Sequence, residues 1–157
     1  MIGAMNPTIY SFLLFLHVSA AAFWVGGMAT MHLAVRPAAV ATLQPPLRLP
    51  LMAAALTRFF GGVTVAVITL WATGLVMIML AGGRMHWRVH VMLALALVMT
   101  AVYLRIRLAP WPKLREALAA SDWPSAGRQL DRIRHMVAMN LAMGVAVFAV
   151  AIMGRAF

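Results

Sequence analysis

Four long runs of apolar residues dominate the chain, at about residues 8–35, 56–80, 87–104 and 133–153. A helix needs about 20 mostly apolar residues to cross the hydrocarbon core of a bilayer, which is about 30 Å thick. In lipid the backbone amides must be paired within the segment, and unbroken runs lack the alternation of barrel strands. The pattern therefore predicts an all-α integral membrane protein, a four-transmembrane-helix bundle forming a single domain over residues 1–157.

The polar segments between the runs predict two kinds of link. Residues 36–50 contain Pro37 and several further prolines, so we expect an extended crossing along the membrane surface there. Residues 105–132 are expected to form a basic cytoplasmic loop that includes a short interfacial helix near residues 114–120. A solvated loop that anchors to anionic lipid is the simplest interpretation of this segment.

Composition agrees with a membrane location, because 64% of the 157 residues are hydrophobic and only 10% are charged. The absence of cysteine excludes disulfides, iron–sulfur ligation and thiolate metal sites. The 5 histidines and 14 methionines remain as soft ligands for a metal.

The net charge of +10 would suggest a nucleic-acid partner in a soluble protein, but the distribution of the charge favours a topological role and no nucleic acid. Ten of the 13 basic residues fall on one side of the predicted bundle: Arg36, Arg48, Arg58, Arg105, Arg107, Lys113, Arg115, Arg128, Arg132 and Arg134. By the positive-inside rule this side is cytoplasmic, and both termini are then on the opposite side.

His17 lies well inside the first run, about 10 Å below the interfacial Tyr10 at 1.5 Å per residue. An ionisable side chain inside a span marks a functional site by default. His86 and His90 are i, i+4 neighbours at the start of the third run, on the same side of the membrane as His17. His17 with His90 is predicted to bind haem iron axially. Two alternatives stay open: a copper or zinc site of His17, His86 and His90, and a neutral His17 bonded to a neighbouring helix.

A second pair of histidines falls near the cytoplasmic side. His32 follows His17 by fifteen residues, which places it about 60° round the helix and some 22 Å further along. His135 opens the fourth run at the same level, so His32 with His135 is predicted to hold a second haem or metal. The alternative is that both histidines belong to an ordinary basic interface.

Three other residues fit the haem hypothesis. Trp24 lies two turns below His17 on the same helical face and is expected to pack against the macrocycle. Gly27 is expected to admit the ring. Arg58 is expected to neutralise a propionate, unless it simply extends to lipid phosphate.

Methionines also gather in the cytoplasmic half of the first and fourth runs: Met28, Met31, Met136, Met139 and Met143. Thioethers at these spacings are able to pass Cu(I) along a helix. The alternative is that they are pliable apolar packing.

The first run resembles a known family. Residues 16–27 read Leu-His-Val-Ser-Ala-Ala-Ala-Phe-Trp-Val-Gly-Gly, and Arg36-Pro37 follow. This segment resembles the opening helix of the CopD-type copper-resistance membrane domain and of the related HemJ-like haem proteins. Weaker similarity extends over all four runs. The resemblance implies a four-helix bundle in a bacterial inner membrane, which places the termini on the periplasmic side. His17 takes the place of the first-helix histidine that both groups share.

The two branches of the resemblance imply different functions. CopD-like proteins imply copper uptake or resistance, and HemJ-like proteins imply b-type haem and oxidation of protoporphyrinogen. HemJ-like chains have Trp, any residue, His, any residue, Lys in the third helix. Here residues 87–92 read Trp-Arg-Val-His-Val-Met, so the histidine is shifted by one position and the lysine is missing. This departure weakens the specific enzyme more than haem binding.

The leading hypothesis from sequence is a membrane b-type haem protein in electron transfer or haem-linked oxidation, an oxidoreductase if it is an enzyme. It would hold one or two haems and exchange electrons with quinone or another small carrier. The alternative is a copper-binding or copper-transport protein that uses His and Met ligands. In either case the lipid bilayer is the surrounding partner, and the glycine-bearing helix faces allow a homodimer.

Overall fold

The computed structural model describes residues 6–82 and 85–153, so Arg84 and Arg155 lie outside the described part. Four helical stretches there are long and apolar enough to cross a membrane: Pro7–Thr42, Pro45–Leu80, Trp87–Ala119 and Trp123–Met153. Every element within the described ranges is helical. The predicted all-α bundle with four membrane spans is therefore confirmed.

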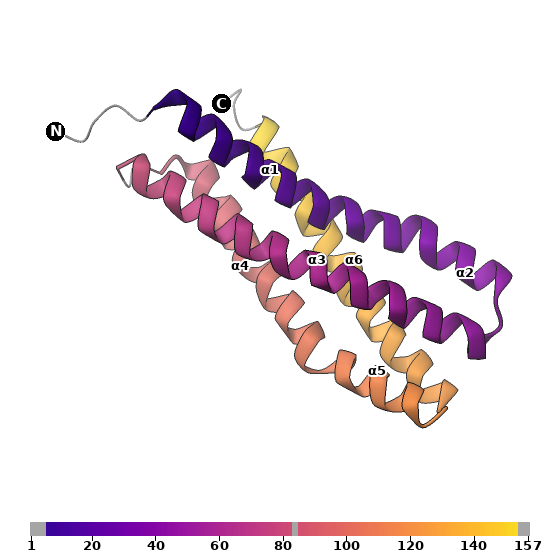
Figure 1. The fold of residues 1–157 in the computed structure, drawn as a ribbon. Coiled ribbons are helices and arrows are strands. Elements are labelled where there is room, and N and C mark those ends of the chain that lie inside the picture. The colour runs from indigo at the N-terminus through magenta and orange to yellow at the C-terminus, as the bar shows by residue number, and fades with distance from the viewer. Residues whose placement is uncertain (1–5, 83–84, 154–157) are drawn as a thin grey trace.

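The first span is longer than predicted and contains a π-helical turn. Helix α1 (Pro7–Thr30) is followed by η1 (Met31–Val35) and α2 (Arg36–Thr42) without a break in the chain direction (Figure 1). The predicted end near residue 35 is wrong because Pro37 does not interrupt the helix. It follows a π-turn and occupies the first turn of α2, where a missing N–H has little cost.

The predicted extended link over residues 36–50 is also wrong. Helix α3 (Pro45–Leu80) begins directly after Leu43 and Gln44, the two residues with extended backbone angles between α2 and α3. Pro45 and Pro46 lie in the first turn of α3, where backbone N–H groups have no helical partner in any case. Prolines thus start this helix rather than preventing it.

The predicted basic loop over residues 105–132 is helical for most of its length. Helix α4 (Trp87–Leu108) ends just before Pro110, α5 (Pro110–Ala119) follows, and α6 (Trp123–Met153) begins ten residues before the fourth predicted run. The short helix expected in this segment is present as α5, with a start earlier than expected, and its interfacial position stays a prediction.

Burial explains why this segment folds. Leu114 and Ala126 are completely buried, and Trp111 and Ala117 are nearly so, while Lys113, Arg115 and Glu116 are exposed. Helix α5 therefore presents one apolar face to the bundle and one charged face outward. A solvated loop would leave that apolar face without a partner.

The four spans are arranged so that α1 packs against α3 and α6, and α4 packs against α6 and α5. The starts of α1 and α4 and the ends of α3 and α6 lie together at what we call the terminal end (Figure 1). Helix α2, the start of α3, α5 and the start of α6 lie at the opposite, basic end. The assignment of these ends to the two sides of the membrane stays a prediction.

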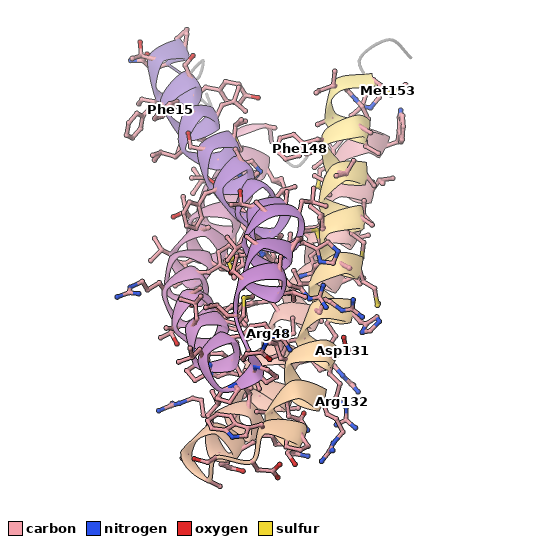
Figure 2. All side chains as sticks on the ribbon, turned by 90° about the vertical axis from the view of Figure 1, so that its right-hand side faces the viewer. Phe15, Arg48, Asp131, Arg132, Phe148 and Met153 are labelled. Carbon is pink, nitrogen blue, oxygen red and sulfur yellow. The ribbon has the colours of Figure 1, made fainter. Side chains whose placement is uncertain are left out.

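Buried side chains are concentrated toward the basic end and the middle of the bundle. In α1 they begin at Trp24, in α4 they begin at Met99, and in α6 they stop at Gly144. Figure 2 shows Phe15 pointing away from the bundle at the terminal end, and nitrogen-bearing side chains gathered around Arg132 at the basic end. The terminal end is therefore loosely packed by comparison.

Candidate functional site

His17 is half-buried between α1 and α3, near the terminal end of the bundle. Its Nδ1 atom lies 2.8 Å from the hydroxyl oxygen of Thr73. The hydroxyl donates its single proton to the carbonyl oxygen of Thr69, 2.6 Å away, so the imidazole Nδ1–H donates to Thr73. Gly74 leaves the space for the ring, because a Cβ there would come within 3.2 Å of His17 Cε1.

In the arrangement in which the Thr73 hydroxyl donates to Thr69, His17 carries its proton on Nδ1. With the proton on Nδ1, the lone pair of Nε2 is free to bind a metal. Histidines that bind metals usually donate their other ring N–H in this way, which orients the ring. The alternative that His17 is a neutral histidine bonded to a neighbouring helix agrees with the same contact, so His17 is satisfied by the fold and still able to bind a ligand.

The other two histidines of the terminal end do not join His17 in a cluster. His86 and His90 are exposed at the start of α4, and Nδ1 of His90 lies 3.3 Å from the carbonyl oxygen of His86 in the preceding turn. Within residues 6–82 and 85–153, no three histidine or acidic side chains come close enough to hold a metal. The predicted three-imidazole site is therefore not formed, because His17 faces α3 while His86 and His90 lie on α4. Axial pairing of His17 with His90 stays a prediction.

A hollow lies at the basic end, between η1, α3 and α6, with a volume of about 40 Å³. His32 lines it together with Arg36, Arg134 and apolar side chains that include Met31 and Met52. His135 is outside this lining: its side chain is 65% exposed and lies beside Asp131 on α6. The pairing of His32 with His135 also stays a prediction.

The space that a haem would need near the first helix is filled by aromatic side chains. Trp24 is buried edge-on against Tyr103, with ring centroids 6.3 Å apart. The open face of Gly27 is taken by the ring of Phe59, which a Cβ there would meet, and that of Gly62 by Phe23. Trp24 and Gly27 therefore pack helix against helix, and these residues do not fit a macrocycle. Arg58 is exposed on α3, which favours its alternative role at the lipid surface.

Two polar residues in the core were not predicted as site residues. Asn140 on α6 is 2% exposed and donates from Nδ2 to the carbonyl oxygen of Met99, while its Oδ1 is buried without a hydrogen-bond partner. It lines a cavity of about 10 Å³ together with Met28 and Tyr103. A polar side chain inside an apolar run is the signal from which Asn140 could have been found. Thr73 offered a weaker signal, because threonines are common in helices that cross membranes.

Several methionines face the interior. Met28, Met52 and Met99 are buried, and Met31, Met136 and Met143 pack against the core. Met139, by contrast, is 58% exposed on α6. The bundle thus has a series of thioethers inside it, on all four spans, with Met31 on the π-turn of the first span.

The fold defines the class of the protein as a multi-pass helical membrane protein. Comparison with known families gives the identity: the chain belongs to the CopD family, described as copper resistance protein D, whose family model matches residues 53–153. This range contains most of α3 and all of α4, α5 and α6, and so adds to the resemblance seen in the first helix. The HemJ-like branch of that resemblance is not confirmed. No curated protein and no solved structure is similar enough to this chain to count as a match.

Proposed function

We propose that this protein binds copper within a bacterial inner membrane and passes it through the bundle, as part of copper resistance or uptake. The observation that carries the proposal is the CopD family match over residues 53–153. The family match favours this alternative from sequence over the haem hypothesis, and the aromatic packing against Gly27 and Gly62 agrees with that preference.

The chemistry of the interior supports Cu(I) as the form that is carried. The chain has no cysteine and only three acidic residues, so hard cations have few oxygen ligands in the bundle. Thioether and imidazole ligands are soft and neutral, and they suit a singly charged soft ion. A single charge also costs less than a double charge in a medium of low dielectric constant.

The residues that we assign to this function lie at two levels. His17, with Nε2 free, would take copper near the terminal end. The buried thioethers of Met28 and Met99 would offer the next ligands toward the middle of the bundle. Each thioether is a weak ligand on its own, so an ion held by few of them is able to leave again.

Copper content of the purified full-length chain tests the proposal. The protein is loaded with Cu(I) under reducing conditions, freed of unbound metal and assayed for copper against protein concentration, and its visible spectrum is recorded. We expect retained copper and no haem bands. Met28→Leu with Met99→Leu should lower the retained copper, because leucine keeps the volume and removes the thioether. Met139→Leu is the matched control, since this methionine is 58% exposed.

Two results would overturn the proposal. A reduced Soret band with sharp α and β bands, lost in His17→Ala, would restore the competing hypothesis of a b-type cytochrome with quinone as partner. A folded protein that retains neither copper nor haem would instead indicate a subunit without a cofactor.

A further inference from the structure

The hollow at the basic end has features that copper binding does not explain. Two arginines, Arg36 from α2 and Arg134 from α6, are among the residues that line it, beside His32. Two fixed positive charges disfavour a copper ion there, even though Met31 and Met52 also contribute to the lining. The two arginines therefore favour an anionic ligand.

One of these arginines, Arg134, has a buried donor that the protein does not satisfy. Arg134 donates from Nη2 to Asp131 at 2.8 Å, but its Nε is buried and has no partner. Among the described residues, Asp131 is the one acidic side chain that forms ion pairs, and its partners are Arg134 and His135. A buried donor without a partner destabilises the protein, so a ligand that accepts from it gains a corresponding advantage.

The remaining walls of the hollow are apolar, with Leu56 from α3 and Ile133 and Val137 from α6. Its volume of about 40 Å³ is room for a few atoms of water size, at roughly 10–15 Å³ each. That is the size of a phosphate group. A ligand with a phosphate at one end and a hydrocarbon chain at the other matches both parts of this lining.

We propose that the hollow binds one anionic phospholipid from the leaflet at the basic end. Arg36 and Arg134 donate to its phosphate oxygens, and Leu56 and Ile133 contact the first part of its acyl chain. Basic pockets between membrane helices commonly hold anionic headgroups on the side where arginine and lysine accumulate. Guanidinium groups suit this task because they donate to phosphate in pairs. The lipid site is independent of copper binding.

Thermal unfolding of the full-length protein in a mild detergent, followed by tryptophan fluorescence, tests the lipid site. Phosphatidylglycerol is expected to raise the melting temperature, whereas phosphatidylcholine and inorganic phosphate at the same concentration should not. Arg36→Gln and Arg134→Gln should each reduce the shift, and the double variant should abolish it. Arg132→Gln is the control, because Arg132 is exposed on α6 at the same end and does not line the hollow.

Native mass spectrometry gives a second measurement that does not depend on variants. The wild-type chain should retain one phosphatidylglycerol when phosphatidylcholine dissociates, and copper content should be the same with and without the lipid. Equal stabilisation by phosphatidylcholine, or by inorganic phosphate, would overturn the proposal. So would an equal loss of the shift in Arg132→Gln, which would indicate a diffuse basic surface instead of a site.

Discussion

The two ends of the bundle are held together in different ways. At the basic end, Phe60 of α3 is 1% exposed and packs edge-on against Tyr103 and Trp111, with ring centroids 6.1 and 5.2 Å apart. At the terminal end, Phe12 and Phe15 of α1 are 60% and 65% exposed, and the link to α3 is the hydrogen bond between His17 and Thr73. In lipid, burial alone gives little drive for helices to associate, so close fits and polar contacts decide where they meet. Close aromatic packing therefore distinguishes the basic end, where the Tyr103 hydroxyl also donates to the carbonyl oxygen of Phe60, whereas the terminal end combines a polar contact with less packing.

Phe60→Ala is expected to have the largest effect on stability and tests the close packing of the basic end. Removal of a fully packed aromatic ring typically costs about 3–5 kcal/mol in free energy of unfolding. Phe12→Ala is the matched change at the terminal end and should cost less than about 0.5 kcal/mol, because the ring lies on the outside. Unfolding in detergent under identical conditions measures both. Similar losses for the two variants would show that the ends are packed alike.

Gly144→Val tests the close approach of helices in the middle of the bundle. A Cβ at Gly144 of α6 would lie 2.6 Å from Cγ2 of Val25 on α1, and a β-branched valine has little freedom to move away. We expect a loss of about 1–3 kcal/mol in free energy of unfolding from overpacking. Gly26→Val is the control, because a Cβ at Gly26 meets nothing within 4 Å. If Gly144→Val is as stable as its control, the helices are not in close contact at this level.

Thr73→Val should have the smallest effect on stability and tests the hydrogen bond between His17 and Thr73 at the terminal end. Hydrogen bonds between membrane helices contribute about 0.6 kcal/mol on average, so a loss of that order is expected. In a His17→Ala background the same substitution should cost less, because the partner is already gone. If Thr73 also orients His17 as a ligand, Thr73→Val should lower retained copper more than it lowers stability. An unchanged cost in the His17→Ala background would mean that the pair does not interact.

The sequence was sufficient to predict the four spans but not their true lengths. Hydropathy depends on composition, so the runs were visible directly. Proline, in contrast, has different effects at different positions in a helix. Pro37, Pro45 and Pro46 all fall in first turns, where proline is tolerated, and local sequence does not distinguish these positions from a break.

The sequence identified single residues of the candidate site but not the contacts between them. A histidine inside a span identified His17, but Thr73 lies 56 positions further along the chain and is one of several threonines on α3. Which of them meets His17 depends on how α1 and α3 are rotated against each other. The same rotation brings Phe59 against Gly27, a contact between α3 and α1 that hydropathy does not reveal.

The π-turn at Met31–Val35 has a consequence for register. Its N–H groups reach back five residues, as in the bond from Arg36 to the carbonyl oxygen of Met31, so the turn contains one residue more than an α-helix would use. One residue corresponds to a rotation of about 100° in an α-helix. Deleting Leu33 or Ala34 would therefore turn Arg36 away from the hollow without removing any side chain that lines it. The orientation of Arg36 thus depends on the number of residues in the π-turn. An insertion or deletion in the turn would change that orientation more than most substitutions nearby.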